Sequence, residues 1–245
     1  MRFIFHNKGY FMDRRQFNHI GMSSLGILIA STYQQAYALS LGDLSNADAT
    51  SGIKTALEKG ALSAIGLLGR TDGFLGNDKV RIPLPGFLND AGKLMKNLGQ
   101  GRRVDELVTA MNRGAEQAVP MAKDLLVSTV KGMNVTDAKN ILSGGDTSIT
   151  KFFAEKTREP LGVQFLPIVH EATDKVGLAD KYNSFASRAA NFGLVSKEDA
   201  NIQQYVTGKG LDGMYFMIGE EEKKLRQNPM AAGSDILRRV FSVLK

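Results

Sequence analysis

Apolar residues recur at steps of three and four along most of this chain, and this spacing narrows the possible folds more than any other feature. Between residues 47 and 69 six positions carry the pattern: Ile53, Ala56, Leu57, Ala61, Ala64 and Leu68. Such steps place side chains on one face of an α-helix, whereas a half-buried strand alternates every second residue. Similar spacing predicts further helices near 87–98, 103–133, 136–143, 147–153, 160–176, 178–192, 196–226 and 234–244. We therefore expect an all-α fold, a single bundle of about eight helices.

Prolines and glycines indicate where these helices bend or stop. Pro120 lies inside the stretch 103–133 and cannot donate to the carbonyl of Glu116, so a kink is expected there. Pro160 suits the first turn of a helix, which Pro167 should bend and Gly177 should end. Residues 72–86 break the helical period and predict a loop with one short extended segment.

Polar residues at the expected helix starts predict caps. Thr136 and Asp146 are candidate N-caps, and Ser196 with Asp199 forms an S-x-x-D capping box. Ser234 is expected to cap the last helix, and Asn228-Pro229 to end the one before it.

The first 38 residues have the three parts of a secretory signal peptide. Arg14 and Arg15 form a cationic head, residues 20–30 an apolar segment, and Ala36-Tyr37-Ala38 a small-residue cleavage box. The apolar segment is shorter than the ~20 residues that a membrane-spanning helix needs, so we expect no permanent membrane anchor. The prediction is a periplasmic protein that is cleaved after Ala38, leaving 39–245 as one helical domain.

The route of export and the true start of the chain stay open. Arg14-Arg15 followed by Phe17 resembles the twin-arginine signal, but Asp13 and Asn18-His19 depart from its usual pattern, which leaves the general secretion route as the alternative. Met12 is an alternative start, because residues 1–11 add nothing that such a signal needs.

Composition excludes several classes of function. Residues 1–38 hold four basic residues and one acidic residue, so the remaining 207 carry 27 basic and 24 acidic residues, a formal net charge of +3. No run of Lys and Arg interleaved with aromatic residues occurs among them, so we expect no nucleic-acid partner. The chain has no cysteine, which rules out disulfides, thiolate metal sites and thiol nucleophiles. We expect no cofactor and no metal, and the oligomeric state is left open.

Asn112, Arg113 and Glu116 are the first group of candidate ligand-binding residues. Asn112 and Glu116 lie one helical turn apart, Arg113 is within reach of Glu116, and all three stand near the expected kink at Pro120. A kink with polar groups is a suitable edge for a small-molecule pocket. The alternative is a network within the helix that only satisfies its own polar groups.

Glu221 and Arg226 are the second candidate group, as a partly buried pair at the mouth of a ligand site. The alternative is an exposed ladder of i,i+4 pairs, Glu220 with Lys224 and Glu222 with Arg226, which would support a solvated helix.

Two further motifs could carry chemistry. His170, with Glu171 beside it and Asp174 one turn later, could be an oriented base, although a lone helical histidine is more often structural. The stretch "GKGLDG", residues 208–213, matches the G-x-G-x-x-G of dinucleotide sites, but it lacks the strand before it and a long enough chain after it. Close helix packing through its glycines is the preferred interpretation.

Long segments of the chain together resemble one known family. They are "DGFLGNDKVRIPLP", "MNRGAEQA", "DAKNILSGGDTSITKFF", "FLPIV", "YVTGKGLDGMYFMIGEEEKKLRQNP" and "RRVFSVLK", and they extend in order from about Leu44 to Lys245. The chain resembles the bacterial exported domain-of-unknown-function family numbered 4197. This resemblance implies a mostly helical exported domain and assigns no activity, cofactor or substrate. Gly114 stands where the family more typically has alanine.

Three hypotheses of function follow. The first is a non-enzymatic periplasmic protein that binds a small apolar or lipid-like ligand between its helices, in a pliable lining that includes Met214-Tyr215-Phe216-Met217. These side chains could instead simply fill the core. The second is a cofactor-free envelope hydrolase that uses carboxylates and His170, and the third is a scaffold that binds other envelope proteins.

Overall fold

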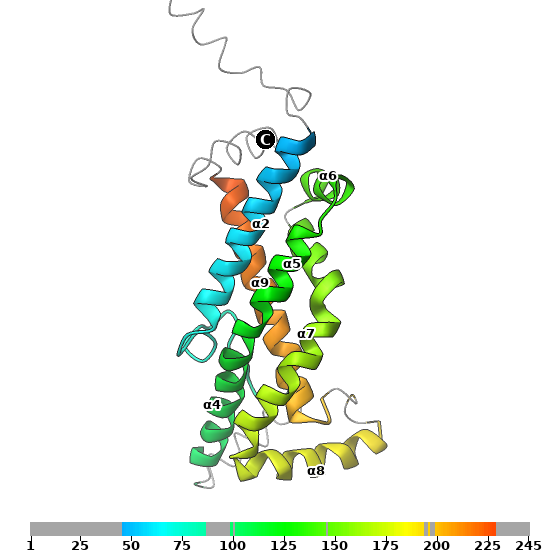
Figure 1. Ribbon diagram of the computed structural model, residues 1–245. Coiled ribbons are helices and arrows are strands. Elements are labelled where there is room, and N and C mark those ends of the chain that lie inside the picture. The colour runs from blue at the N-terminus through cyan, green and yellow to red at the C-terminus, as the bar shows by residue number, and fades with distance from the viewer. Residues whose placement is uncertain are drawn as a thin grey trace, which may run out of the picture. The chain divides into compact units, whose positions relative to one another are not determined.

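The computed structural model describes residues 46–86, 99, 101–145, 147–193, 196 and 199–228, all within one compact unit, residues 45–245. The described residues form helices and turns and contain no strand, which confirms the predicted all-α bundle (Figure 1). The elements are α2 (Asn46–Leu68), α4 (Gly101–Ala118), the 3₁₀ turn η4 (Val119–Met121), α5 (Ala122–Lys131), α6 (Val135–Ser143), α7 (Ser148–Asp174), α8 (Gly177–Asn191) and α9 (Ile202–Gln227).

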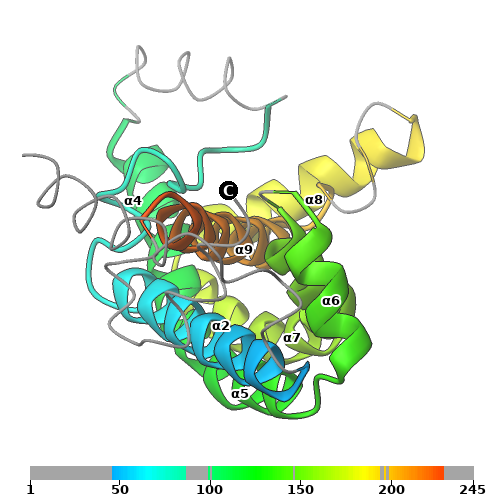
Figure 2. The same cartoon turned by 90° about the horizontal axis from the view of Figure 1, so that it is seen from above.

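Helix α9 is the central element of this bundle. It packs against α2, α4, α7 and α8, and α2 and α7 run alongside it (Figures 1 and 2). Helix α8 lies across one end of the other helices (Figure 1). Met214, Tyr215 and Met217 are buried in α9, whereas Phe216 is exposed. Three side chains of this run therefore fill the core rather than line an open space.

The first predicted helix and the predicted kink are both present. All six apolar positions of the α2 stripe are buried, as a helix with one face against a core requires. At Pro120 the α4 helix passes through η4 into α5, so the expected break in the long helix is confirmed. Pro120 occupies one of the first positions of the 3₁₀ turn, where its missing N–H costs least.

The prediction of two helices over 147–176 is wrong, because α7 is one continuous helix of 27 residues with Pro160 and Pro167 inside it. The two prolines are seven residues apart and both are exposed. The carbonyls that they leave without a helical partner belong to Lys156 and Val163, which are also exposed and can be solvated. Helix α7 ends at Asp174, and Gly177 begins α8 instead of ending α7.

Two predicted caps are also corrected. The N-cap of α6 is Asn134, not Thr136, because Asn134 and Asp137 form a reciprocal capping box. The Ser196 hydroxyl does accept the backbone N–H of Asp199, at 3.0 Å, but α9 starts later, with Asn201 as its N-cap. The predicted end of this helix at residue 228 is confirmed.

Several predictions lie outside the described residues. They are the signal peptide over 1–38, the helices over 87–98 and 234–244 with the Ser234 cap, and the cap at Asp146. Among the described residues, 69–86 form turns and irregular backbone, so the loop is confirmed but its extended segment pairs with no strand there. None of the described helices is both long enough and apolar enough to span a bilayer.

Candidate functional site

The side chain of Asn112 joins α4 to the loop 69–86. Its amide oxygen accepts the backbone N–H of Ile82 at 2.8 Å, and its amide nitrogen donates to the Ile82 carbonyl at 2.9 Å and to the Val108 carbonyl at 2.8 Å. Asn112 is fully buried, and its oxygen and both of its N–H groups have partners. This side chain therefore pairs with Ile82 as a neighbouring strand would.

Glu116 fixes the beginning of the same loop. Its Oε1 accepts the backbone N–H groups of Phe74 at 3.0 Å and Leu75 at 3.1 Å, and its Oε2 accepts Arg113 Nη1 at 2.6 Å. Arg113 also donates to Asp72 at 2.8 Å. Hydrogen bonds and charge from the two carboxylates raise the pKa of Arg113 above its usual value.

The first candidate group thus forms a polar network that holds a loop. The interpretation of a network confined to one helix is wrong, because Asn112 and Glu116 reach across to residues 74–82. A ligand-binding role for these residues stays a prediction, and of the three only Arg113 borders an open groove.

Arg226 pairs with a different glutamate from the one predicted. It contacts Glu222 at 3.0 Å and also donates to the Ser148 hydroxyl at 2.8 Å and the Ile141 carbonyl at 3.1 Å. Glu221 instead pairs with Lys224 at 2.6 Å. The predicted Glu221–Arg226 pair is therefore replaced by a Glu222–Arg226 pair that lies almost entirely out of solvent.

The alternative, an exposed i,i+4 ladder, predicts the Glu222–Arg226 pair correctly, but it is wrong about the exposure of that pair and about the partner of Glu220. Glu220 binds Lys79 of the loop at 2.6 Å rather than Lys224, and Glu222 is buried. Glu222 accepts the backbone N–H groups of Ile149 at 3.3 Å and Thr150 at 3.4 Å, so it supplies acceptors to the start of α7. Burial raises the pKa of Glu222 above its ordinary value, while bonds from Ile149 and Arg226 oppose this shift.

His170 forms the contact expected from its sequence neighbours. Its Nδ1 lies 2.6 Å from Asp174 Oδ2, but both side chains are about half exposed, at 59% and 47%. The pair stands on the outer face of α7 and does not line the groove described below. Because a general base is typically held in a cleft, the solvated His170 is a poor candidate for that role.

The "GKGLDG" stretch lies inside α9, so a dinucleotide-binding turn between a strand and a helix is excluded. A Cβ placed at Gly213 would lie 2.7 Å from a ring carbon of Phe74, and one at Gly210 would lie 3.4 Å from the Cβ of Ala115. The preferred interpretation, close helix packing through glycines, is confirmed at Gly210, which faces Ala115 of α4, whereas Gly213 makes room for Phe74 of the loop 69–86.

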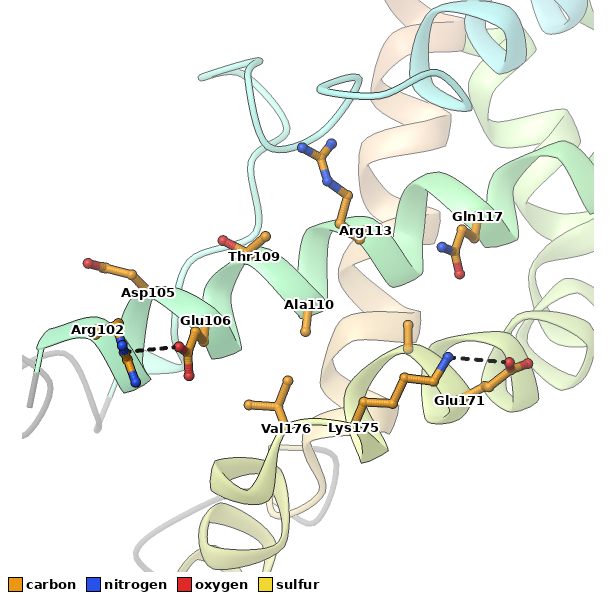
Figure 3. A pocket seen from close by; sticks show the side chains of 11 residues that line it. Arg102, Asp105, Glu106, Thr109, Ala110, Arg113, Gln117, Glu171, Lys175 and Val176 are labelled. Carbon is orange, nitrogen blue, oxygen red and sulfur yellow. Dashed lines mark ion pairs between the residues drawn. The ribbon is translucent and has the colours of Figure 1, made fainter.

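An open groove of about 760 Å³ separates α4 from the end of α7 (Figure 3). Its apolar part comes from Ala110 on α4 and from Ala172 and Val176 at the end of α7. Beside it the two helices touch closely, because a Cβ at Gly114 would lie 3.2 Å from that of Ala172. A glycine therefore suits position 114 in this chain, where α4 meets α7.

Charged side chains surround the apolar part of this groove. Arg102 pairs with Glu106 at 3.3 Å, and Lys175 pairs with Glu171 at 3.7 Å, so the rim alternates in sign (Figure 3). These pairs span one helical turn and are visible in the sequence, but on their own they resemble any solvated helix surface. The two pairs lie on the rim of one groove only because α4 packs on α7.

The described residues contain no group of three or more His, Asp or Glu side chains that could hold a metal ion. The groove has an apolar floor and a charged rim that includes the carboxylates of Asp105, Glu106 and Glu171.

Comparison with known proteins gives a family and no function. No curated protein and no solved structure matches the chain. The family model described as "Protein of unknown function (DUF4197)" matches residues 43–242, which is most of the chain. The chain belongs to the DUF4197 family.

Proposed function

We propose that this protein is an exported, non-enzymatic binding protein that holds an amphiphilic, lipid-like molecule in the groove between α4 and α7. The single observation that supports this proposal is the composition of that groove. Ala110, Ala172 and Val176 offer an apolar strip, and Arg102 and Lys175 stand at its rim with their acidic partners. A few placed charges around apolar contacts are typical of small-molecule sites, and a volume of about 760 Å³ is within their usual range.

The groove suits such a ligand better than the interior does. Met214 and Met217 are buried among core side chains, so the apolar run of α9 is used for packing. An alkyl chain lying on the apolar strip would remove apolar surface from water. This burial favours binding by roughly 25 cal/mol for each Å² removed. The ligand would therefore rest on the surface of the bundle, with its polar end among the rim charges.

The two alternatives have weaker support. A cofactor-free hydrolase that used carboxylates and His170 would need them to converge in a cleft, whereas His170 and Asp174 are paired on an exposed face. A scaffold would need an exposed apolar face. Among the described residues, the three most exposed of the large apolar side chains, Phe192, Val163 and Met121, lie on different elements or beyond a helix end.

A single tryptophan tests the binding proposal, because the chain contains none. We would place it at Val176, in the groove just after the end of α7, and, as a matched control, at Val163, which is 73% exposed on α7. Titration with n-dodecyl maltoside below its critical micelle concentration should shift the emission of Val176→Trp to the blue. The emission of Val163→Trp should not change. Equal responses of the two variants, or none from either, would overturn the proposal.

Export is tested separately. N-terminal sequencing of the protein from the bacterial envelope should begin at Leu39, and replacing Arg14 and Arg15 by Lys should block export by the twin-arginine route. Recovery of an uncut chain inside the cell would contradict the export proposal. Continued secretion of the double variant would point to the general secretion route.

A further inference from the structure

The groove continues into a second hollow where α4 meets the start of α8. This hollow measures about 450 Å³ and shares Glu106, Lys175 and Val176 with the groove. Its other lining residues are Arg103, Gly177 and Lys181. The apolar strip and this hollow therefore form one continuous surface depression.

The hollow is cationic. It is lined by three basic side chains, Arg103, Lys175 and Lys181, and by one acidic side chain, Glu106, which Arg102 already contacts. Within the described part of the chain no ion pair includes Arg103 or Lys181, and both residues are exposed. Among the described residues, no acidic side chain forms an ion pair with either of these two positive charges.

The backbone adds to this positive potential. Helix α8 begins at Gly177, which lines the hollow, and the start of a helix carries the positive end of its dipole. The Ala179 N–H already donates to the Val176 carbonyl at 2.9 Å, and Asp180 lies in the same first turn, so the contribution of the backbone is smaller than that of the side chains. Free cationic side chains together with such a helix start favour an anion, above all one with several acceptor oxygens.

We propose that this cationic end binds the anionic headgroup, a phosphate monoester or a carboxylate, of an amphiphile whose alkyl chain lies on the strip of Ala110, Ala172 and Val176. This inference rests on the proposed binding function and names its ligand class. The arrangement orients the ligand, with its head between α4 and α8 and its tail along the groove between α4 and α7.

Three probes distinguish the contribution of the headgroup to binding from that of the alkyl chain, in calorimetric titrations of the purified protein. They are n-dodecyl phosphate, the uncharged n-dodecyl maltoside, and inorganic phosphate alone. We expect n-dodecyl phosphate to bind at least about tenfold more tightly than the maltoside and to weaken as salt is added. Inorganic phosphate alone should bind far more weakly than n-dodecyl phosphate, because it lacks the chain.

A double substitution tests the two free cations. Arg103→Gln with Lys181→Gln should remove most of the preference for n-dodecyl phosphate and leave maltoside binding unchanged. The matched control is Lys123→Gln with Lys151→Gln, which removes the same charge from exposed positions on α5 and α7 outside both hollows. The control should keep the preference.

The possible failures are distinguishable. Equal affinity for n-dodecyl phosphate and the maltoside would refute the headgroup inference and leave the binding function standing. No binding of either amphiphile would refute the binding function itself. Inorganic phosphate that binds as tightly as n-dodecyl phosphate would show an ion site without an amphiphile, and would overturn the inference. Should the double variant fail to fold, the salt dependence and the probe comparison on the unsubstituted chain still decide.

Discussion

Glu116 Oε1 accepts the backbone N–H of Phe74 at 3.0 Å, across 42 residues of sequence. This contact places the fully buried Phe74 ring against α9 at Gly213 and thereby connects three segments: the loop, α4 and α9. A charged side chain at 4% exposure is stable here because Arg113 and two backbone N–H groups satisfy it.

Replacing Glu116 by Ala should lower the free energy of unfolding by about 2–4 kcal/mol, because the N–H groups of Phe74 and Leu75 lose their acceptor. Urea unfolding followed by circular dichroism measures the change. The control is Asp72→Asn, which removes the other carboxylate that contacts Arg113. Because Asp72 is exposed, this change should lower the free energy of unfolding by less than about 1 kcal/mol. Similar losses in the two variants would contradict this account of the loop.

Glu222→Ala should cost about 3 kcal/mol, because it leaves Arg226 without its carboxylate in a mostly buried position. In the unsubstituted protein Glu222 accepts hydrogen bonds from the backbone amides of Ile149 and Thr150. These amides should therefore also exchange faster with deuterium in the variant. Lys223→Ala, at the exposed next position, should change stability by no more than about 0.5 kcal/mol. Unchanged exchange at residues 149 and 150 would show that Glu222 does not support the start of α7.

Two glycines of the "GKGLDG" stretch should respond in opposite directions to the same change. Gly208→Ala should stabilise the protein by up to about 1 kcal/mol, because a Cβ there meets nothing within 4 Å and alanine favours the helix. Gly213→Ala should destabilise it by about 1–3 kcal/mol, because its Cβ would lie 2.7 Å from the Phe74 ring. Thermal unfolding of the two variants measures the change in Tm for each. Equal changes in Tm would mean that the Phe74 ring can move away from the new Cβ.

The hydroxyl of Tyr205 should make stability depend on alkaline pH. Burial, aided by the charge of Asp199, raises the pKa of Tyr205 to about 12. An unfolded tyrosine ionises near pH 10, so between about pH 10 and 12 the folded state keeps a proton that the unfolded state has released. The free energy of unfolding is therefore unaffected below pH 10 and falls by about 2–3 kcal/mol as the pH rises through this window.

Urea unfolding at several pH values between 9 and 12 tests this dependence. Tyr205→Phe should reduce the pH slope in this window, while losing at all pH values the hydrogen bond that the hydroxyl donates to Pro83, 3.1 Å away. Tyr215, whose pKa is also raised by burial, keeps its share of the slope in both proteins. The pKa of Tyr182 is raised mainly by burial and, to a lesser extent, by the charges of Asp199 and Tyr205, so its share should shrink slightly in the variant. An identical slope with and without the Tyr205 hydroxyl would contradict the assigned cause.

Local interactions explain which parts of the fold the sequence predicted correctly. The α2 stripe, the break at Pro120 and the end of α9 at residue 228 all depend on residues within one or two helical turns. The helix start expected at Pro160 is wrong, because the cost of a proline inside a helix depends on which face it occupies, and that face is set by the packing of α7 against α4 and α9.

Sequence spacing predicted only part of the charged contacts. It paired Glu222 with Arg226 correctly, but it missed that Glu222 is buried and accepts backbone N–H groups at the start of α7. It also paired Glu220 with Lys224, whereas Glu220 binds Lys79 of the loop. These contacts join positions 73 and 141 residues apart, and no local pattern contains that information.

Periodic burial and capping are local properties of the chain, so the amino-acid sequence alone is enough to predict a helical bundle. The position of the groove could not be predicted in this way, because Ala110 and Val176 become neighbours only through the packing of α4 on α7. The same packing, with the start of α8 beside it, decided that Arg103 and Lys181 face one hollow. Pair partners and surface hollows depend on how helices dock, and docking is set by the shape of the whole core rather than by any one segment.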